Sequence, residues 1–175
     1  MAVVDGSSAG ERAVGNGATH LLLRMPQASV RSFHRALVEL LQTAGVPVLV
    51  SDRVDLALAV GAAGVNLPEA GLGAREARVL LGPGPLLGRS VHSVEGVASA
   101  AAQGADFVLL GPIFPTPTHP ATPGLGLQLL QRAVAAAPIP VLAIGGVDRE
   151  RAARCLAAGA AGYAGIRIFE SGDLR

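Results

Sequence analysis

Short apolar runs alternate with amphipathic segments along the whole of this sequence. The segments between the runs repeat apolar residues at i, i+3, i+4 and i+7, which is typical of helices packed on one face. Because the runs are continuously apolar, they indicate a sheet buried on both faces, with parallel strands joined by crossover helices. We expect eight strands, at residues 2–4, 20–23, 46–50, 63–67, 86–91, 106–111, 139–146 and 163–168.

Eight strand–helix units predict an α/β fold, a (β/α)₈ TIM barrel that occupies residues 1–175 as one domain. The chain is short for that fold, which usually takes about 200 residues or more. We therefore expect an abbreviated first unit and a truncated final helix. An open, doubly wound sheet is the alternative, and it would bind its ligand where the strand order reverses.

The composition excludes several classes of function. The sequence has fourteen arginines and no lysine, so Schiff-base chemistry on lysine and a lysine-containing phosphate loop are excluded. The arginines are scattered and aromatic residues make up only 3%, which disfavours nucleic-acid binding. Cys155 is the only cysteine, so neither an internal disulfide nor a cysteine metal site is expected. Arginine, backbone N–H groups or helix N-termini must therefore bind any anionic ligand.

The sequence indicates neither a secretory leader nor a membrane span. No basic segment precedes an apolar one at its start, and Pro138 and Pro140 interrupt the apolar stretch near its end. These features predict a cytoplasmic protein with no membrane partner.

Polar side chains follow several of the expected strands, where a barrel would bring them to one mouth. One of them, His119, lies in a stretch at 109–126 that holds five prolines and must be a stiff, extended loop. Asp52 and Ser93 also stand where a helix N-cap is expected, and capping alone is an equal alternative for each. The candidate residues at the mouth are Arg24, Ser51, Asp52, Asn66, Ser90, His92, Thr116, Thr118 and His119.

Two glycines at the end of the seventh run form the strongest local signal. In AIGGV, Gly145 and Gly146 let backbone N–H groups approach an anion closely, and a helical segment follows. Barrels of this kind often bind phosphate between strands seven and eight. The predicted phosphate site comprises Gly145, Gly146, Gly165, Ile166 and Arg167.

Three strings resemble the thiamine phosphate synthase family, which includes a thiazole tautomerase branch. They are VSDRVDLALAVGAAGVNLPEAGL, GRSVHSVEGVASAAAQGADFVLLGPIFPTPTHP and IPVLAIGGV, and the likeness extends over residues 20–168. The resemblance implies a (β/α)₈ barrel, a phosphorylated thiazole as small-molecule partner, and a place in thiamine biosynthesis.

The chain departs from the motifs that the resemblance implies for a synthase. The Arg-Glu-Lys after strand two is Arg24-Met25-Pro26 here, and the Thr-Lys after strand six is Thr118-His119. The acidic magnesium ligand after strand four is replaced by Gly71, although Glu69 lies nearby. A site without those two lysines and that carboxylate is poorly built to neutralise a departing pyrophosphate.

The strings NLPEAG and GRSVHS resemble the tautomerase branch instead. We therefore expect an isomerase that aromatises a carboxylated thiazole phosphate by proton transfer, without metal or cofactor. The histidine that serves this branch after the strand-six glycine is Pro112 here, so His119 is the expected general acid–base and His92 the other candidate. Asp52 or Ser51 would orient the ring or the thiazole.

The other mouth residues are assigned to substrate binding: Arg24 as an anchor for the carboxylate, with Asn66, Ser90, Thr116 and Thr118. Two alternatives stay open. One is a synthase that couples pyrimidine pyrophosphate to thiazole phosphate, and the other is a non-catalytic binding or regulatory relative. A truncated final helix would expose an apolar strip, so a homo-oligomer, in the simplest case a dimer, is expected.

Overall fold

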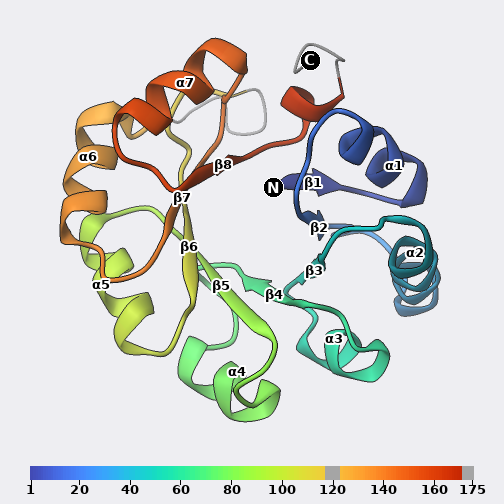
Figure 1. Cartoon of the computed structure of the whole chain (residues 1–175). Coiled ribbons are helices and arrows are strands. Elements are labelled where there is room, and N and C mark those ends of the chain that lie inside the picture. Colours follow the sequence, from blue (N-terminus) through green and yellow to red (C-terminus); the bar gives the residue numbers. More distant parts are fainter. Residues whose placement is uncertain (117–122, 171–175) are drawn as a thin grey trace.

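The computed structural model describes residues 1–116 and 123–170. Within these residues, eight parallel strands form one sheet in the order of the sequence, with seven α-helices around it (Figure 1). The strands are β1 (Ala2–Val4), β2 (Leu21–Leu23), β3 (Val48–Ser51), β4 (Gly64–Leu67), β5 (Leu86–Val91), β6 (Phe107–Leu110), β7 (Val141–Ile144) and β8 (Gly162–Ala164). The helices are α1 (Ser7–Gly15), α2 (Val30–Thr43), α3 (Val54–Val60), α4 (Ala74–Leu81), α5 (Val94–Ala102), α6 (Gly126–Ala136) and α7 (Arg149–Ala157).

The first and last strands lie side by side, so the sheet curls into a nearly closed barrel (Figure 1). An isolated parallel bridge joins Ala2 to Gly165, and the N–H of Val3 donates to the Gly165 carbonyl at 2.9 Å. The TIM-barrel prediction is confirmed, and the open-sheet alternative is wrong.

The last strand is shorter than the sequence pattern predicts. It ends at Ala164, and a short 3₁₀ helix, η1 (Arg167–Phe169), follows where the apolar run suggested continued strand. Both Ile168 and Phe169 are buried in this turn. Burial therefore explains the apolar run without a strand, since periodicity alone does not separate the two in a short segment.

Strand side chains alternate between the barrel interior and the surrounding helices. Leu21 and Leu23 of β2 belong to the same buried cluster as Leu37 of α2, whereas Leu22 belongs to a separate cluster inside the barrel. Burying one such leucine contributes about 1.5–3 kcal/mol relative to leaving it exposed. The interior cluster consists of Val3, Leu22, Leu49, Phe107, Leu109 and Ala164.

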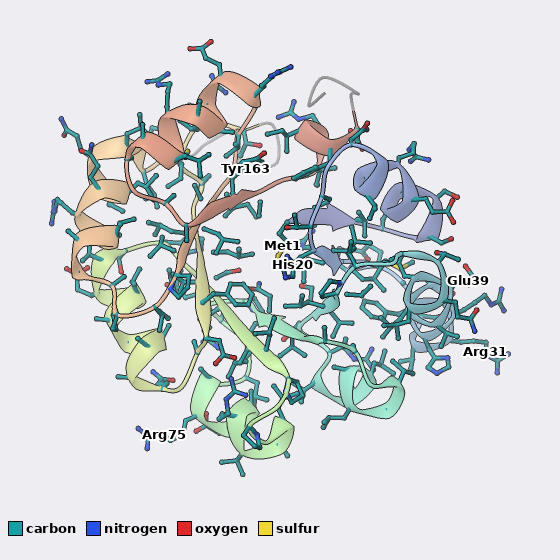
Figure 2. All side chains as sticks on the ribbon, in the orientation of Figure 1. Met1, His20, Arg31, Glu39, Arg75 and Tyr163 are labelled. Carbon is teal, nitrogen blue, oxygen red and sulfur yellow. The ribbon has the colours of Figure 1, made fainter. Side chains whose placement is uncertain are left out.

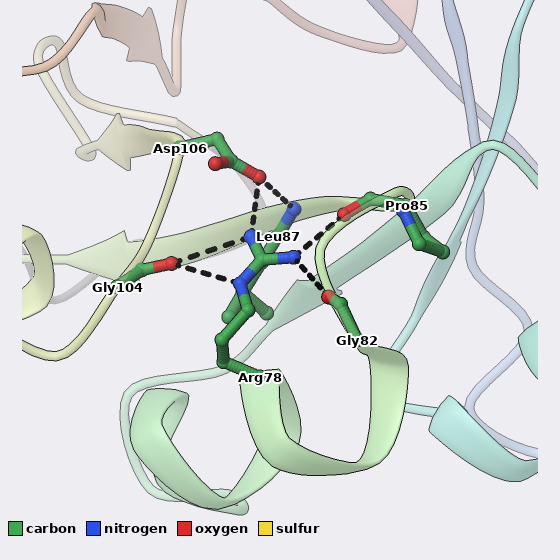
Figure 3. A network of polar contacts seen from close by, with 6 residues as sticks. All are labelled: Arg78, Gly82, Pro85, Leu87, Gly104 and Asp106. Carbon is green, nitrogen blue, oxygen red and sulfur yellow. Dashed lines mark hydrogen bonds and ion pairs between the residues drawn. The ribbon is translucent and has the colours of Figure 1, made fainter.

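A polar network fastens the amino-terminal ends of β5 and β6 (Figure 3). Nη1 of Arg78, from α4, donates to the carbonyls of Gly82 and Pro85 at 2.9 Å. Its Nη2 lies 2.5 Å from Oδ2 of Asp106, which also accepts the N–H of Leu87 at 2.7 Å. The network lies at the end of the barrel opposite the mouth, where polar contacts serve stability.

Charged side chains such as Arg31, Glu39 and Arg75 stand away from the helical ring, whereas His20 lies toward its centre (Figure 2). Across residues 1–116 and 123–170, the helices lack the length and apolar character that crossing a membrane requires.

Candidate active site

Polar side chains from three neighbouring strands line the carboxyl-terminal end of the barrel. Ser51 ends β3 and is paired in register with Asn66 of β4. Asn66 is only 4% exposed, and its Nδ2 donates to Oγ of Ser90 on β5 at 3.0 Å. Among the described residues, Oδ1 of Asn66 has no hydrogen-bond partner. The structure therefore brings Ser51, Asn66 and Ser90 together at the mouth, and their role in substrate binding stays a prediction.

Asp52 has a left-handed backbone, with φ of 63°. Its N–H donates to the carbonyl of Asn66 at 3.0 Å, and the N-cap position of α3 falls on Arg53 without a side-chain cap. The capping alternative is therefore wrong for Asp52. The carboxylate is directed toward the loop after β4, because a β-carbon on Gly71 would lie 3.0 Å from Oδ1 of Asp52.

Ser93, the other residue for which capping was expected, does cap its helix. It stands at the N-cap of α5, and its Oγ accepts the N–H of Gly96 at 3.0 Å.

His92 follows β5 and joins two loops at the mouth. Its Nδ1 hydrogen-bonds the carbonyl of Gly111, which can only accept, so Nδ1 carries a proton. Its Nε2 lies 3.7 Å from Oε2 of Glu69, and the His92 side chain is 56% exposed. In the neutral ring, Nε2 is therefore the basic atom and it faces a carboxylate. This geometry suits an acid–base group.

Arg89 clamps the loop that carries Glu69. Its Nη2 donates to the carbonyl of Glu69 at 2.8 Å, and its Nη1 donates to the carbonyl of Leu72. Sequence reasoning missed this residue, because the contact joins a strand to carbonyls of a different loop and leaves no motif.

Arg24 follows β2, and its N–H donates to the carbonyl of Val4 at 2.8 Å. It lines a cavity of about 90 Å³ between β1, α1 and η1, together with Asp5, Ile166 and Glu170. Arg24 and Ile166, predicted in separate groups, are therefore brought to one cavity at the edge of the mouth.

The two glycines after β7 have left-handed backbones, with φ of 90° at Gly145 and 64° at Gly146. Gly165 lies beside them, because Ile144 is paired with Ala164. Its own N–H, however, donates to the carbonyl of Met1 at 3.3 Å, so this group helps to close the barrel. Arg167 lies in η1 rather than in a strand.

Three further predicted residues belong to the segment after β6. Thr116 is described and is partly buried. Thr118 and His119 lie outside the described residues. The role given to His119 therefore stays a prediction.

The resemblance to synthases seen in the sequence implies magnesium. Proteins usually bind Mg²⁺ with one or two carboxylates together with phosphate oxygens of the substrate. Asp52 fits the role of a single protein ligand, because its carboxylate lies at the mouth beside the loop after β4. In the described part of the chain, no group of three or more His, Cys, Asp or Glu side chains could hold a metal by itself.

These features define a (β/α)₈ barrel whose polar and charged residues gather at the carboxyl ends of its strands. Comparison with known proteins places the chain in a narrower class than the barrel fold. The chain belongs to the thiamine monophosphate synthase family, whose model matches residues 5–169.

Curated relatives in this family are named for one activity, thiamine-phosphate synthase. The thiamine-phosphate synthase of Roseiflexus castenholzii is 39% identical over 176 residues, which covers 94% of this chain and 77% of the relative. That of Myxococcus xanthus is 44% identical over 153 residues, covering 85% and 70%. A solved structure of thiamine phosphate pyrophosphorylase from Pyrococcus furiosus superposes with a TM-score of 0.86 at 31% identity, over 99% of this chain and 88% of that one.

These comparisons overturn the expectation of a thiazole tautomerase, and with it the assignment as an isomerase. The relatives at 39% and 44% identity are named as synthases, which are transferases. The missing lysines and Gly71 do not exclude a synthase. Arginine and backbone N–H groups can also neutralise a pyrophosphate, and Mg²⁺ needs as few as one protein carboxylate.

Proposed function

We propose that this protein is a thiamine-phosphate synthase, which transfers a pyrimidine-bearing group from its pyrophosphate ester to thiazole phosphate. A bond to the thiazole forms, the bond to pyrophosphate breaks, and pyrophosphate leaves. The observation that carries the proposal is the 44% identity to the Myxococcus xanthus synthase over 85% of the chain.

The residues at the mouth can take different parts in this reaction, according to their charge and hydrogen-bonding groups. Asp52 would hold magnesium, which when bound neutralises charge on the pyrophosphate. Arg24 supplies a positive charge at the mouth. The turn at Gly145 and Gly146, which precedes α7, would bind the phosphate of the thiazole through backbone N–H groups. Asn66 and Ser90 would offer hydrogen bonds to the ring of either substrate.

His92 is the group that we assign to proton transfer or to orientation of a substrate. Its Nδ1 is committed to Gly111, so Nε2 is the atom that would meet a substrate. His119 stays a second candidate for this role, and Thr116 and Thr118 stay candidates for contacts to phosphate.

Purified protein should form thiamine phosphate from pyrimidine pyrophosphate and thiazole phosphate in the presence of Mg²⁺. Product detection by chromatography, with pyrophosphate measured in parallel, tests this directly. Binding of both substrates without product would instead favour the non-catalytic relative. The expected homodimer also stays a proposal, and sedimentation at several protein concentrations checks it.

A further inference from the structure

Arg151 connects the glycine turn after β7 to helix α7 and to the segment after β6. Its Nη1 donates to the carbonyl of Gly146 at 2.9 Å. Its backbone N–H is capped by Oδ1 of Asp148 at 2.8 Å, and its Nε lies 3.5 Å from the other oxygen of that carboxylate. Its guanidinium carbon also lies 5.0 Å from the centre of the Phe114 ring. The side chain is therefore restrained on three sides.

The glycine turn that Arg151 holds is packed closely against the segment after β6. A β-carbon on Gly146 would lie 2.8 Å from Cβ of Phe114, and one on Gly145 would lie 2.5 Å from Cβ of Pro112. The N–H of Phe114 donates to the carbonyl of Gly145 at 3.1 Å. One side of the turn is thus fixed by β6 and its loop, while the Gly146 carbonyl is fixed by Arg151.

Fixing that carbonyl also fixes the next N–H. The carbonyl of Gly146 and the N–H of Val147 belong to one planar peptide and point in opposite directions. The hydrogen bond from Arg151 to the carbonyl therefore sets where the N–H of Val147 points. Without this hydrogen bond the plane of the Gly146–Val147 peptide could rotate, because glycine allows several backbone conformations.

We propose that Arg151 is a positioning residue for the phosphate of thiazole phosphate, acting by orienting the Gly146–Val147 peptide. The proposal rests on the phosphate site proposed above. Arg151 acts through the backbone of the turn, while the N–H groups of the turn bind the anion. The guanidinium also places a positive charge behind the turn, which favours an anion in front of it.

Arg154 provides a matched control on the same helix. Its guanidinium carbon lies 5.7 Å from the centre of the same Phe114 ring, so it shares the charge and the aromatic contact. The hydrogen bond to Gly146 comes from Arg151. A difference between Arg151→Ala and Arg154→Ala therefore reports the hydrogen bond of Arg151 to Gly146 together with its ion pair to Asp148.

The test compares Arg151→Ala, Arg151→Lys and Arg154→Ala by calorimetric binding of thiazole phosphate and of the same thiazole without its phosphate. We expect Arg151→Ala to weaken binding of the phosphorylated thiazole about tenfold, because a charge-assisted hydrogen bond is lost. Binding of the unphosphorylated thiazole should not change. Arg151→Lys should recover part of the affinity, and Arg154→Ala should resemble the wild type.

In steady-state assays, Arg151→Ala should raise the KM for thiazole phosphate and leave kcat within about twofold. Equal affinity of Arg151→Ala and wild type for thiazole phosphate would overturn the proposal, as would equal losses for both forms of the thiazole. If Arg151→Ala fails to fold, the other two variants still test the proposal. Wild-type affinity of Arg151→Lys for thiazole phosphate, together with a tenfold loss in Arg154→Ala, would overturn it. Wild-type protein that binds thiazole phosphate without making product would refute the synthase activity alone, and the calorimetric comparison would still decide the role of Arg151.

Discussion

Oδ1 of Asp52 lies 3.0 Å from the point that a β-carbon on Gly71 would occupy. The two residues come from the loops after β3 and β4, and the left-handed backbone of Asp52 turns its carboxylate toward that neighbouring loop. The chain therefore has the carboxylate of Asp52 here, and Gly71 stands at the neighbouring position where the resemblance to synthases implies a second carboxylate.

Asp52→Asn should lower kcat by about 10²- to 10³-fold, because it removes the carboxylate that we assign to magnesium while keeping the side-chain shape. Initial rates of pyrophosphate release at saturating substrates measure the effect. Asp55→Asn is the control, because Asp55 is exposed and pairs with Arg53 at 2.5 Å. A fully active Asp52→Asn enzyme would remove Asp52 from the reaction.

Gly71→Asp should lower the Mg²⁺ concentration needed for half-maximal rate, because a second carboxylate would stand beside Asp52. The change also has a cost. The new β-carbon would lie 2.9 Å from Cγ of Pro68, and we expect overpacking to destabilise the fold by about 1–3 kcal/mol. Magnesium titrations of Gly71→Asp and Gly71→Asn separate the two effects, since only the first adds charge. Identical magnesium dependence in the two variants would show that residue 71 does not reach the metal.

Arg78→Ala should destabilise the protein by about 2–3 kcal/mol without changing kcat, because it leaves the Asp106 carboxylate without its cation at the far end of the barrel. Urea unfolding followed by circular dichroism gives the free energy. Arg75→Ala is the control, because Arg75 is exposed on the same helix (Figure 2). Equal stability of the two variants would mean that the network in Figure 3 contributes nothing measurable.

The thiol of Cys155 should resist modification until the protein unfolds. Its side chain is fully buried in α7, and burial raises the pKa of the Cys155 thiol because the thiolate is poorly solvated there. Since the folded pKa is raised, folding gains stability from the neutral thiol at low pH, and that gain is lost as the pH rises above the ordinary thiol range. Rates of reaction with a coloured thiol reagent, with and without urea, measure the protection. Rapid labelling of the native protein would contradict it.

The sequence was sufficient to predict the fold, because a sheet that is buried on both faces requires continuously apolar strands. Runs such as VLV in β3 and FVLL in β6 are apolar at every position, which few structures other than a parallel sheet require. This apolar pattern is less specific after β8, where the buried Ile168 and Phe169 of η1 give the same pattern without a strand.

The site was only partly predictable. Strand ends fixed the positions of Ser51, Asn66 and Ser90, since the carboxyl ends of parallel strands face one way. Partners from other elements were not visible, because the contacts of Arg89 and Arg151 are with backbone carbonyls, which carry no sequence signature. The choice of reaction was wrong for a related reason. The absence of lysine does not show that the site lacks positive charge, because the charge at the site depends on which groups the fold brings there.

The most direct measurement is a single-turnover reaction of purified protein with pyrimidine pyrophosphate, thiazole phosphate and Mg²⁺, with thiamine phosphate and pyrophosphate both quantified. The synthase proposal predicts that the two products appear together in equal amounts, and that Asp52→Asn suppresses both. Stoichiometric enzyme that binds thiazole phosphate yet yields no thiamine phosphate would contradict it.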